Sequence, residues 1–279
     1  MAKIENEVIS LEVSSRGAEI ISLFNKETNL EYIWSGDATY WAGRTPILFP
    51  IVGSTWDKKI HIDNQVYEMG NHGLVRTAEF KEEKCTKETL VFSYESNAET
   101  EAKYPFQFKL WVEYRLRENK VLINYRVENK SQRSMPFSFG LHPAFRCPLV
   151  EGESFDDYHI EFSHNETLSG LYGSFGLQKE NKIPLSYPLF ENNGTLCFEY
   201  PKSSSVKLTQ GKHGVSVDLV GYRWLAFWTP KPQAPFLCIE PWHGHGDFEK
   251  VETSFENREG TLILEKGKTY LTTLGIEIF

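Results

Sequence analysis

Hydrophobic and polar residues alternate along most of this chain with a period of two. The clearest case lies between residues 106 and 129, where two alternating runs flank the turn-like Glu118–Asn119. In the first run, "FQFKLWVEYRLRE", nearly every second residue is apolar, and "KVLINYRVEN" repeats the pattern. A period of two is that of a β-strand with one buried face. These residues therefore predict a long antiparallel hairpin.

Shorter runs of the same kind recur along the rest of the chain. They are "VISLEV", "AEIISLF", "LEYIW", "KIHIDNQVYEM", "LVFSYE", "VSVDLVG" and "TLILEKGKTYLTTLGIEIF", with Gly, Asn, Asp and Pro between them. A helix is predicted only as a short segment near "NAETEAKY". The absence of β–α–β alternation and of a Gly-rich phosphate loop disfavours a nucleotide-binding fold. We predict an all-β fold, a single large antiparallel β-sandwich domain over residues 1–279.

The composition of the chain indicates which partners and which cellular location to expect. The formal net charge is −8 and no basic run stands out, which disfavours nucleic acid as a partner. The cysteines form no CxxC pair and are expected to be reduced, mostly buried thiols. The start of the chain lacks the apolar core of a signal peptide, and no apolar stretch reaches the roughly 18 residues of a membrane span. We expect a cytoplasmic monomer or homodimer without membrane or nucleic-acid partners.

Two stretches place histidines among glycines, prolines and apolar residues. In "MGNHGLVR", Asn71 and His72 lie between glycines that let backbone approach a ligand, and Arg76 follows. This histidine would equally suit a turn in which it caps a strand end. In "SFGLHPAFRCP", Pro143 favours an extended backbone at His142 and so fixes the direction of its side chain. A lone histidine in apolar surroundings also fits a core position, so neither stretch decides by itself.

A third stretch, "CIEPWHGHGD", places Glu240 at the end of an apolar run, just before Pro241 and Trp242. Partial desolvation should raise the pKa of this carboxyl group toward neutrality. A purely structural role would require an Arg or Lys partner. Nearby tryptophans would suit a sugar, whose C–H faces pack on aromatic rings. These tryptophans are Trp224, Trp228 and Trp242, and a further one, Trp41, lies near Arg44 in the sequence.

The same stretch has the HxHxxxE spacing of a cupin metal site, formed by His243, His245 and Glu249. A cupin site needs a further histidine downstream, and none follows His245. We therefore do not predict a metal site at these residues.

Four stretches carry a resemblance to a known family. They are "AGRTPILFPIVG", "MGNHGLVR", "SFGLHPAFRCP" and "FWTPKPQAPFLCIEPWHGHGD". In this order they resemble the galactose mutarotase (aldose 1-epimerase) family, and its bacterial LacX-type branch in particular. The resemblance spans essentially the whole chain. It implies a β-supersandwich and an isomerase that interconverts the α and β anomers of a free sugar without metal or cofactor.

The resemblance also implies residue roles. Glu240 matches the general base that takes the proton from the C1 hydroxyl, and His142 the acid that protonates the ring oxygen. His72 matches a second histidine near that oxygen, and either imidazole could face it. Arg44 matches an arginine that reaches sugar hydroxyls, and Arg76, Asn71 and Trp242 are further substrate-binding candidates. One position departs from the family: where relatives carry a sugar-binding aspartate, "LFENNGTLCFEY" offers Asn193 and Gly194.

Mutarotation requires an acid and a base on opposite sides of a small ring. The two groups should stabilise each other's charged forms, so the pKa of Glu240 should not rise far above about 6.

Three alternatives stay open. A mutarotase for hexose phosphates would need Arg44, Arg76 and Arg146 to converge. A catalytically silent sugar-binding or regulatory protein would explain the missing aspartate. A glycoside hydrolase would pair Glu240 with Asp218 or Asp247.

Overall fold

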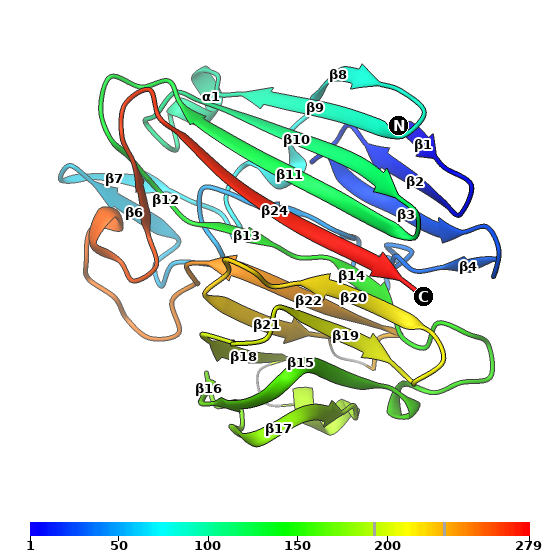
Figure 1. Ribbon diagram of the computed structural model, residues 1–279. Helices are drawn as coiled ribbons and strands as arrows, with labels where there is room; N and C mark the ends of the chain where they lie inside the picture. The colour runs from blue at the N-terminus through cyan, green and yellow to red at the C-terminus, as the bar shows by residue number, and fades with distance from the viewer. Residues whose placement is uncertain (192–193, 231–232) are drawn as a thin grey trace.

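The computed structural model describes residues 1–191, 194–230 and 233–279. Its largest element is an antiparallel sheet that spans the molecule (Figure 1). Its strands, in spatial order, are β17 (Leu177–Pro184), β15 (His159–Leu168), β19 (Ser205–Thr209), β20 (Gly214–Asp218), β24 (Thr269–Ile278), β11 (Lys120–Asn129), β10 (Phe108–Arg117), β9 (Thr89–Glu95) and β8 (Lys81–Cys85). We call it the large sheet.

A second antiparallel sheet, here called the small sheet, packs against the large one. Its strands are β16 (Gly170–Leu171), β18 (Thr195–Glu199), β21 (Trp224–Trp228), β22 (Phe236–His243), β13 (Phe139–Leu141) and β5 (Ile47–Leu48), with β14 (Ala144–Arg146) also paired to β22. The remaining strands are β1 (Ala2–Glu5), β2 (Ile9–Ser14), β3 (Glu19–Asn25) and β4 (Leu30–Glu31) in one sheet, and the pairs β6 (Lys59–Ile62) with β7 (Gln65–Glu68) and β12 (Met135–Phe137) with β23 (Leu262–Leu264). The predicted all-β fold is confirmed.

Helical structure is confined to short segments. The α-helix α1 (Ala98–Glu101) lies where a helix was predicted, and Asn97 caps it by accepting hydrogen bonds from the backbone N–H groups of Glu99 and Thr100. The 3-10 turns are η1 (Val75–Thr77), η2 (Phe155–Asp157), η3 (Tyr187–Phe190) and η4 (Phe255–Asn257). Among the described residues, no helix has the length and apolarity to span a membrane.

The predicted hairpin is formed by β10 and β11, with Phe108 opposite Asn129 and Arg117 opposite Lys120. Burial along β10 alternates as the period-two pattern predicts. Trp111, on the outer face, lies under Lys109 and Arg126, which are 4.8 Å and 4.1 Å from the ring centroid.

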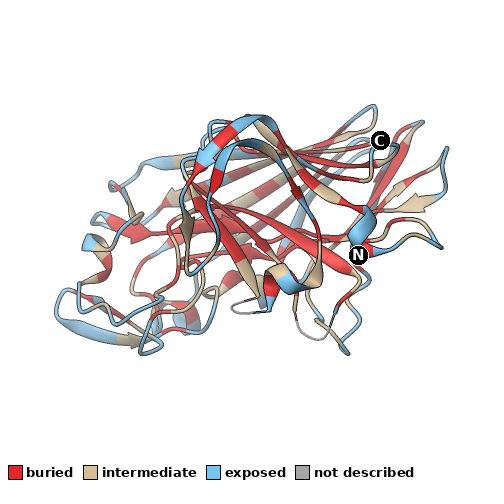
Figure 2. Ribbon diagram, turned by 90° about the horizontal axis from the view of Figure 1, so that it is seen from below, coloured by how far each residue is buried: buried red, intermediate tan, exposed pale blue. Residues whose placement is uncertain are grey.

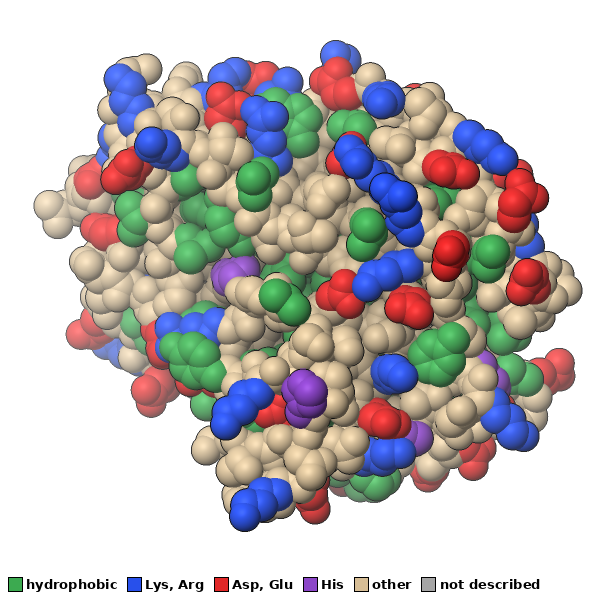
Figure 3. All heavy atoms as spheres, viewed as in Figure 1, with side chains coloured by type: hydrophobic (Ala, Val, Ile, Leu, Met, Phe, Trp, Pro, Cys, Tyr) green, Lys and Arg blue, Asp and Glu red, His purple; other side chains and the backbone are tan. Residues whose placement is uncertain are grey.

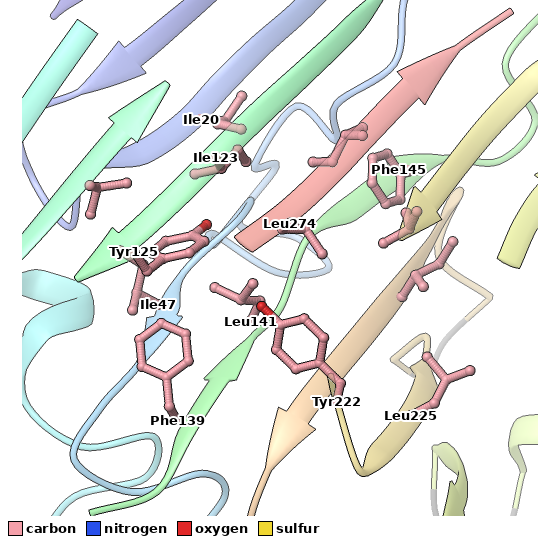
Figure 4. Packing of buried hydrophobic residues seen from close by; sticks show 14 of the residues in the cluster. Ile20, Ile47, Ile123, Tyr125, Phe139, Leu141, Phe145, Tyr222, Leu225 and Leu274 are labelled. Carbon is pink, nitrogen blue, oxygen red and sulfur yellow. The ribbon is translucent and has the colours of Figure 1, made fainter. Parts of the chain in front are cut away.

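The core lies between the two sheets (Figure 4). Ile123, Tyr125 and Leu274 of the large sheet pack toward Phe139 and Leu141 of the small sheet. Buried residues concentrate in the strands of both sheets, while exposed residues concentrate in the loops (Figure 2). On the face shown in Figure 3, positive and negative side chains are interspersed. The described cysteines are free thiols, exposed at Cys85 and buried at the other positions.

The outer face of the small sheet is also buried, and this decides where the site lies. On β22, Leu237 and Ile239 belong to the core between the sheets. Cys238, Glu240 and Trp242 alternate with them and so face the other way. Loops carrying Trp34, Tyr40, Trp41 and Val52 cover that outer face.

Candidate active site

The register of β22 brings two of the predicted site residues together. Gly140 pairs with Trp242 and Ala144 with Cys238, so position 142, between β13 and β14, lies opposite position 240. Nε2 of His142 is 3.2 Å from Oε2 of Glu240. The two residues are only 6% and 2% exposed. The antiparallel register thus joins stretches that lie about a hundred residues apart in the sequence.

Gly140 makes room for Trp242. A Cβ atom at position 140 would lie 2.8 Å from both Cδ1 of Trp242 and Cγ2 of Val52, so only glycine allows the indole to lie across β13. The indole Nε1 of Trp242 is buried and has no hydrogen-bond partner in the described structure. It lies close enough to Glu240 to influence that carboxyl group.

His72 approaches the pair from a loop held against β5. Its backbone N–H donates to the carbonyl of Gly53 at 2.7 Å, and the Gly53 N–H donates to Nδ1 of His72 at 3.1 Å. His72 has a φ of 63°, a left-handed conformation that is uncommon for residues with a side chain. Its ring is 5.3 Å from that of His142, edge to face. Because Nδ1 accepts a hydrogen bond, a neutral His72 carries its proton on Nε2.

Trp41 covers the imidazole of His142. The rings stack with their centroids 4.8 Å apart and 29° between their planes, while Trp228 meets both rings edge-on. The sequence placed Trp41 only near Arg44. Trp41 stacks on His142 because the loop before β5 crosses the outer face of the small sheet. The path of that loop cannot be predicted from a local sequence pattern.

Burial dominates the electrostatics of this site. Desolvation raises the pKa of Glu240 well above its usual value, and the Trp242 side chain only partly opposes the shift. Desolvation also lowers the pKa of His142 well below its usual value, with smaller contributions from His72 and Arg76 in the same direction. The pKa of His72 falls to about 4, through burial first and Arg76 second. All three groups are therefore favoured in their neutral forms.

This differs from the expectation of an ionised acid and base on opposite sides of a sugar ring. The two groups are in direct contact, and burial outweighs the mutual stabilisation of their charged forms. Among the described residues, neither Lys nor Arg forms an ion pair with Glu240. The partner that a purely structural carboxylate would require is therefore not found there.

The pair also has unsatisfied polar atoms. Neither Oε2 of Glu240 nor Nδ1 of His142 has a hydrogen-bond partner within the described ranges. Buried polar atoms are normally paired, and leaving one unpaired costs about 1–3 kcal/mol. Such a site suits a polar ligand that supplies the missing partners.

The row of side chains beside Glu240 contains small residues. Glu240 pairs with Ala226 on β21, and Ala226 pairs with Cys197 on β18. The three residues thus form one row across the outer face, flanked by Trp224 and Trp242. Ala226, between Glu240 and Cys197, has the smallest side chain of the row, and all three residues are buried. Asn193 lies outside the described residues, and Gly194 immediately precedes β18.

The predicted arginines divide into two groups. Arg44 and Arg76 line one hollow with a volume of about 430 Å³, together with Arg16, Glu19 and Trp41. The guanidinium of Arg44 donates to the carbonyl of Ser35. Arg146 does not line this hollow, and its Nε donates to the carbonyl of Ile33 at 3.3 Å. Asn71 is exposed, and no contact found in the described structure joins it to His142 or Glu240.

The alternative pairings for Glu240 do not form. Asp218 makes an ion pair with Lys120 on the large sheet at 2.8 Å. Asp247 is held by Arg258 at 2.5 Å. A glycosidase pair with either carboxylate is thus not assembled.

The HxHxxxE stretch does not gather into a metal site. The His243 ring packs beside Tyr222, with the centroids 4.9 Å apart. His245 approaches Glu259 at 3.6 Å instead. Glu249 lines a different hollow from the arginine hollow.

Comparison with known proteins identifies the family of the chain. Residues 1–277 match the aldose 1-epimerase family. The chromosomal and plasmid LacX proteins of Lactococcus lactis are each 33% identical to the chain, over 285 and 290 residues, covering 95% of this chain and 92% of each relative. A galactose mutarotase related enzyme from Lactobacillus acidophilus is 30% identical with a TM-score of 0.94, covering 100% of this chain and 97% of that one.

A galactose mutarotase-like protein from Lactobacillus casei is also 30% identical, with a TM-score of 0.93 and full coverage of both chains. Sequence and fold therefore agree over the whole length, and the chain belongs to the aldose 1-epimerase family.

Proposed function

We propose that the protein is a mutarotase that interconverts the α and β anomers of a hexose, with Glu240 as base and His142 as acid. The observation that carries this proposal is the 3.2 Å contact between Nε2 of His142 and Oε2 of Glu240, two buried groups whose pKa values are shifted in opposite directions. The C1 hydroxyl and the ring oxygen are bonded to the same carbon, so their acid and base must be close neighbours. A contact pair meets that requirement.

The proton balance of the reaction also suits the pair. Ring opening starts from the ionised pair: the C1 hydroxyl proton moves to the carboxylate of Glu240, and a proton moves from the imidazolium of His142 to the ring oxygen. The pair then holds a neutral acid and a neutral imidazole, which are the forms that burial favours. Rotation about C1–C2 and the reverse transfers close the ring on the other face. The net charge of the pair stays constant, so no proton is exchanged with solvent.

Other residues position the sugar. His72 offers Nε2–H as a neutral donor to the ring oxygen or an adjacent hydroxyl. We place the sugar ring over the small side chain of Ala226, which lies between Glu240 and Cys197 in the cross-strand row. The indole of Trp41 covers one face of the His142 ring, which leaves the nitrogen-bearing edge for proton transfer.

Polarimetry of freshly dissolved α-galactose and α-glucose, with wild type and Glu240→Gln, tests the proposal. The wild type should accelerate mutarotation, and the variant should lose about 10²–10⁴-fold of the rate because its amide cannot accept the proton. The amide resembles the neutral acid that burial favours, so folding should persist. Glu166→Gln is the matched control, since Glu166 is buried on β15 and accepts only the Ser203 N–H at 2.7 Å.

The same experiment separates an enzyme from a silent sugar binder. No acceleration by the wild type, with sugar binding intact by calorimetry, would contradict the proposal and favour the binder. Equal losses in Glu240→Gln and Glu166→Gln would contradict the assignment of the base.

A second candidate, a mutarotase for hexose phosphates, is favoured by the arginine hollow. Arg16, Arg44 and Arg76 face one cavity in which Glu19 is the acidic residue among the described lining. Arg76 also lies near enough to His72 and His142 to lower the pKa of both. A phosphate in the hollow would thus lie beside the site.

Kinetics with galactose and galactose 6-phosphate test this second candidate. A phosphate substrate should have the higher kcat/KM, falling with ionic strength. Arg16→Ser should reduce that kcat/KM by about tenfold, and leave the value for galactose unchanged. Arg117→Ser, at an exposed position on the hairpin, is the control. Equal kcat/KM values for both sugars would rule this candidate out.

A further inference from the structure

Cys238 adds a third reactive group to the site. Cys238 and Glu240 are two residues apart on β22, so both side chains project from the outer face. The sulfur of Cys238, a carboxylate oxygen of Glu240 and a ring nitrogen of His142 all lie within 4.8 Å of one another. All three residues are buried. Neither the mutarotation chemistry nor the proposed position of the sugar uses this thiol.

The spacing suits a small tetrahedral cation. Zinc binds nitrogen and oxygen ligands at about 2.0–2.2 Å, which puts two such ligands about 3.4 Å apart at the tetrahedral angle. Nε2 of His142 and Oε2 of Glu240 are 3.2 Å apart. The thiol lies near enough for a side-chain rotation to complete three ligands. Thiolate and imidazole favour zinc-like cations, whereas Mg²⁺ and Ca²⁺ prefer oxygen ligands.

The charges of the ligands and the unpaired polar atoms also suit a divalent cation. A thiolate and a carboxylate balance the two charges of Zn²⁺, so the buried complex is neutral, and these two anions outweigh the opposing charge of Arg76. Oε2 of Glu240 and Nδ1 of His142 both lack hydrogen-bond partners among the described residues. Binding must displace the thiol proton.

We propose that His142, Cys238 and Glu240 form an inhibitory site for Zn²⁺ or a cation of similar softness. The bound cation occupies the nitrogen and oxygen that the sugar reaction requires, so metal and turnover exclude each other. The inhibition rests on the proposed mutarotase function, whereas the metal binding does not.

The test starts from a Cys85→Ser protein, which lacks the exposed thiol that could bind metal adventitiously. Titration with Co²⁺ should produce a thiolate-to-cobalt charge-transfer band in the near ultraviolet, and Zn²⁺ should displace it. Cys238→Ala in this background should abolish the band. Cys147→Ala, at another buried thiol, should retain it.

Polarimetry of the same proteins, each relative to its own zinc-free rate, supplies the second readout. Zn²⁺ should inhibit the Cys85→Ser protein, and Cys238→Ala should raise the half-inhibiting concentration by about tenfold or more, since even outer-shell changes cost that much affinity.

The outcomes separate the two proposals. No charge-transfer band, or a band that survives Cys238→Ala, overturns the metal site. A band without inhibition overturns the competition with sugar. If no protein shows mutarotation, the proposed function fails, and the band still decides the metal site.

Discussion

At the scale of single residues, His72 shows how backbone strain and chemistry coincide. The residue is held at a φ of 63° by two hydrogen bonds with Gly53. Such strain persists only where the surroundings impose it, and it is concentrated at functional positions. The same hydrogen bonds fix the neutral tautomer. The backbone conformation of this one residue therefore determines which ring nitrogen can donate a hydrogen bond.

We expect the substitution His72→Asn to separate the role of the imidazole ring from that of the backbone conformation. Asparagine tolerates the left-handed conformation, so the melting temperature should stay close to that of wild type, while kcat falls by up to about 10²-fold. Polarimetry and thermal unfolding measure the two quantities. His72→Ala should lose stability as well as activity, because alanine is strained at this φ. Wild-type kcat in His72→Asn would exclude a role for the ring.

The residue scale also shows what the sequence could predict. Glu240, His142 and His72 were identified from their unusual surroundings and from a family resemblance, and the structure brings them together. The direct contact between His142 and Glu240, and a burial deep enough to favour their neutral forms, could not be predicted. It depends on the register of β22 against β13 and β14, which no local pattern encodes. The stacking of Trp41 on His142 could not be predicted either, because it depends on the path of a loop.

At the scale of elements, the sequence was most informative where one face of a strand meets solvent. The β10–β11 hairpin shows clean alternation and was predicted with its turn. β15 and β17, at the edge of the large sheet, are rich in charged residues and were missed. In β21 and β22 both faces are buried, so the run of apolar residues does not reveal which face carries the chemistry.

The cross-strand row Glu240–Ala226–Cys197 gives a prediction at this scale. Ala226→Val keeps a strand-favouring residue but adds bulk where the sugar should rest. We expect KM to rise by about tenfold or more, with a smaller change in kcat. Steady-state polarimetry measures both constants. Ala234→Val is the control, because it adds the same methyl groups at a buried position outside the row. An equal rise in the KM of this control would contradict the proposed position of the sugar.

At the scale of the whole molecule, buried histidines couple stability to pH. The pKa values of His72 and His243 are both lowered to about 4, in each case chiefly by burial. In the unfolded chain these histidines return to about 6.5, so the unfolded state binds more protons between pH 4 and 6.5. The free energy of unfolding should therefore rise with pH through this window and be lost on acidification.

Urea unfolding at a series of pH values between about 4 and 6.5 measures how the free energy of unfolding depends on pH. His243→Gln should reduce the dependence of unfolding free energy on pH, because it removes one of the buried histidines whose pKa is lowered. A slope that His243→Gln does not alter would contradict burial of an uncharged imidazole at this position.

The alternation along β22 has a consequence for how this protein can evolve. Neighbouring residues of one strand serve opposite purposes, with Ile239 in the core and Glu240 in the site. Inserting or deleting a single residue would exchange the two sets and abolish folding and activity together. Point substitutions on the outer face leave the core untouched. New sugar preferences are therefore open to this lineage through replacement within the strands, and changes of length are confined to the loops.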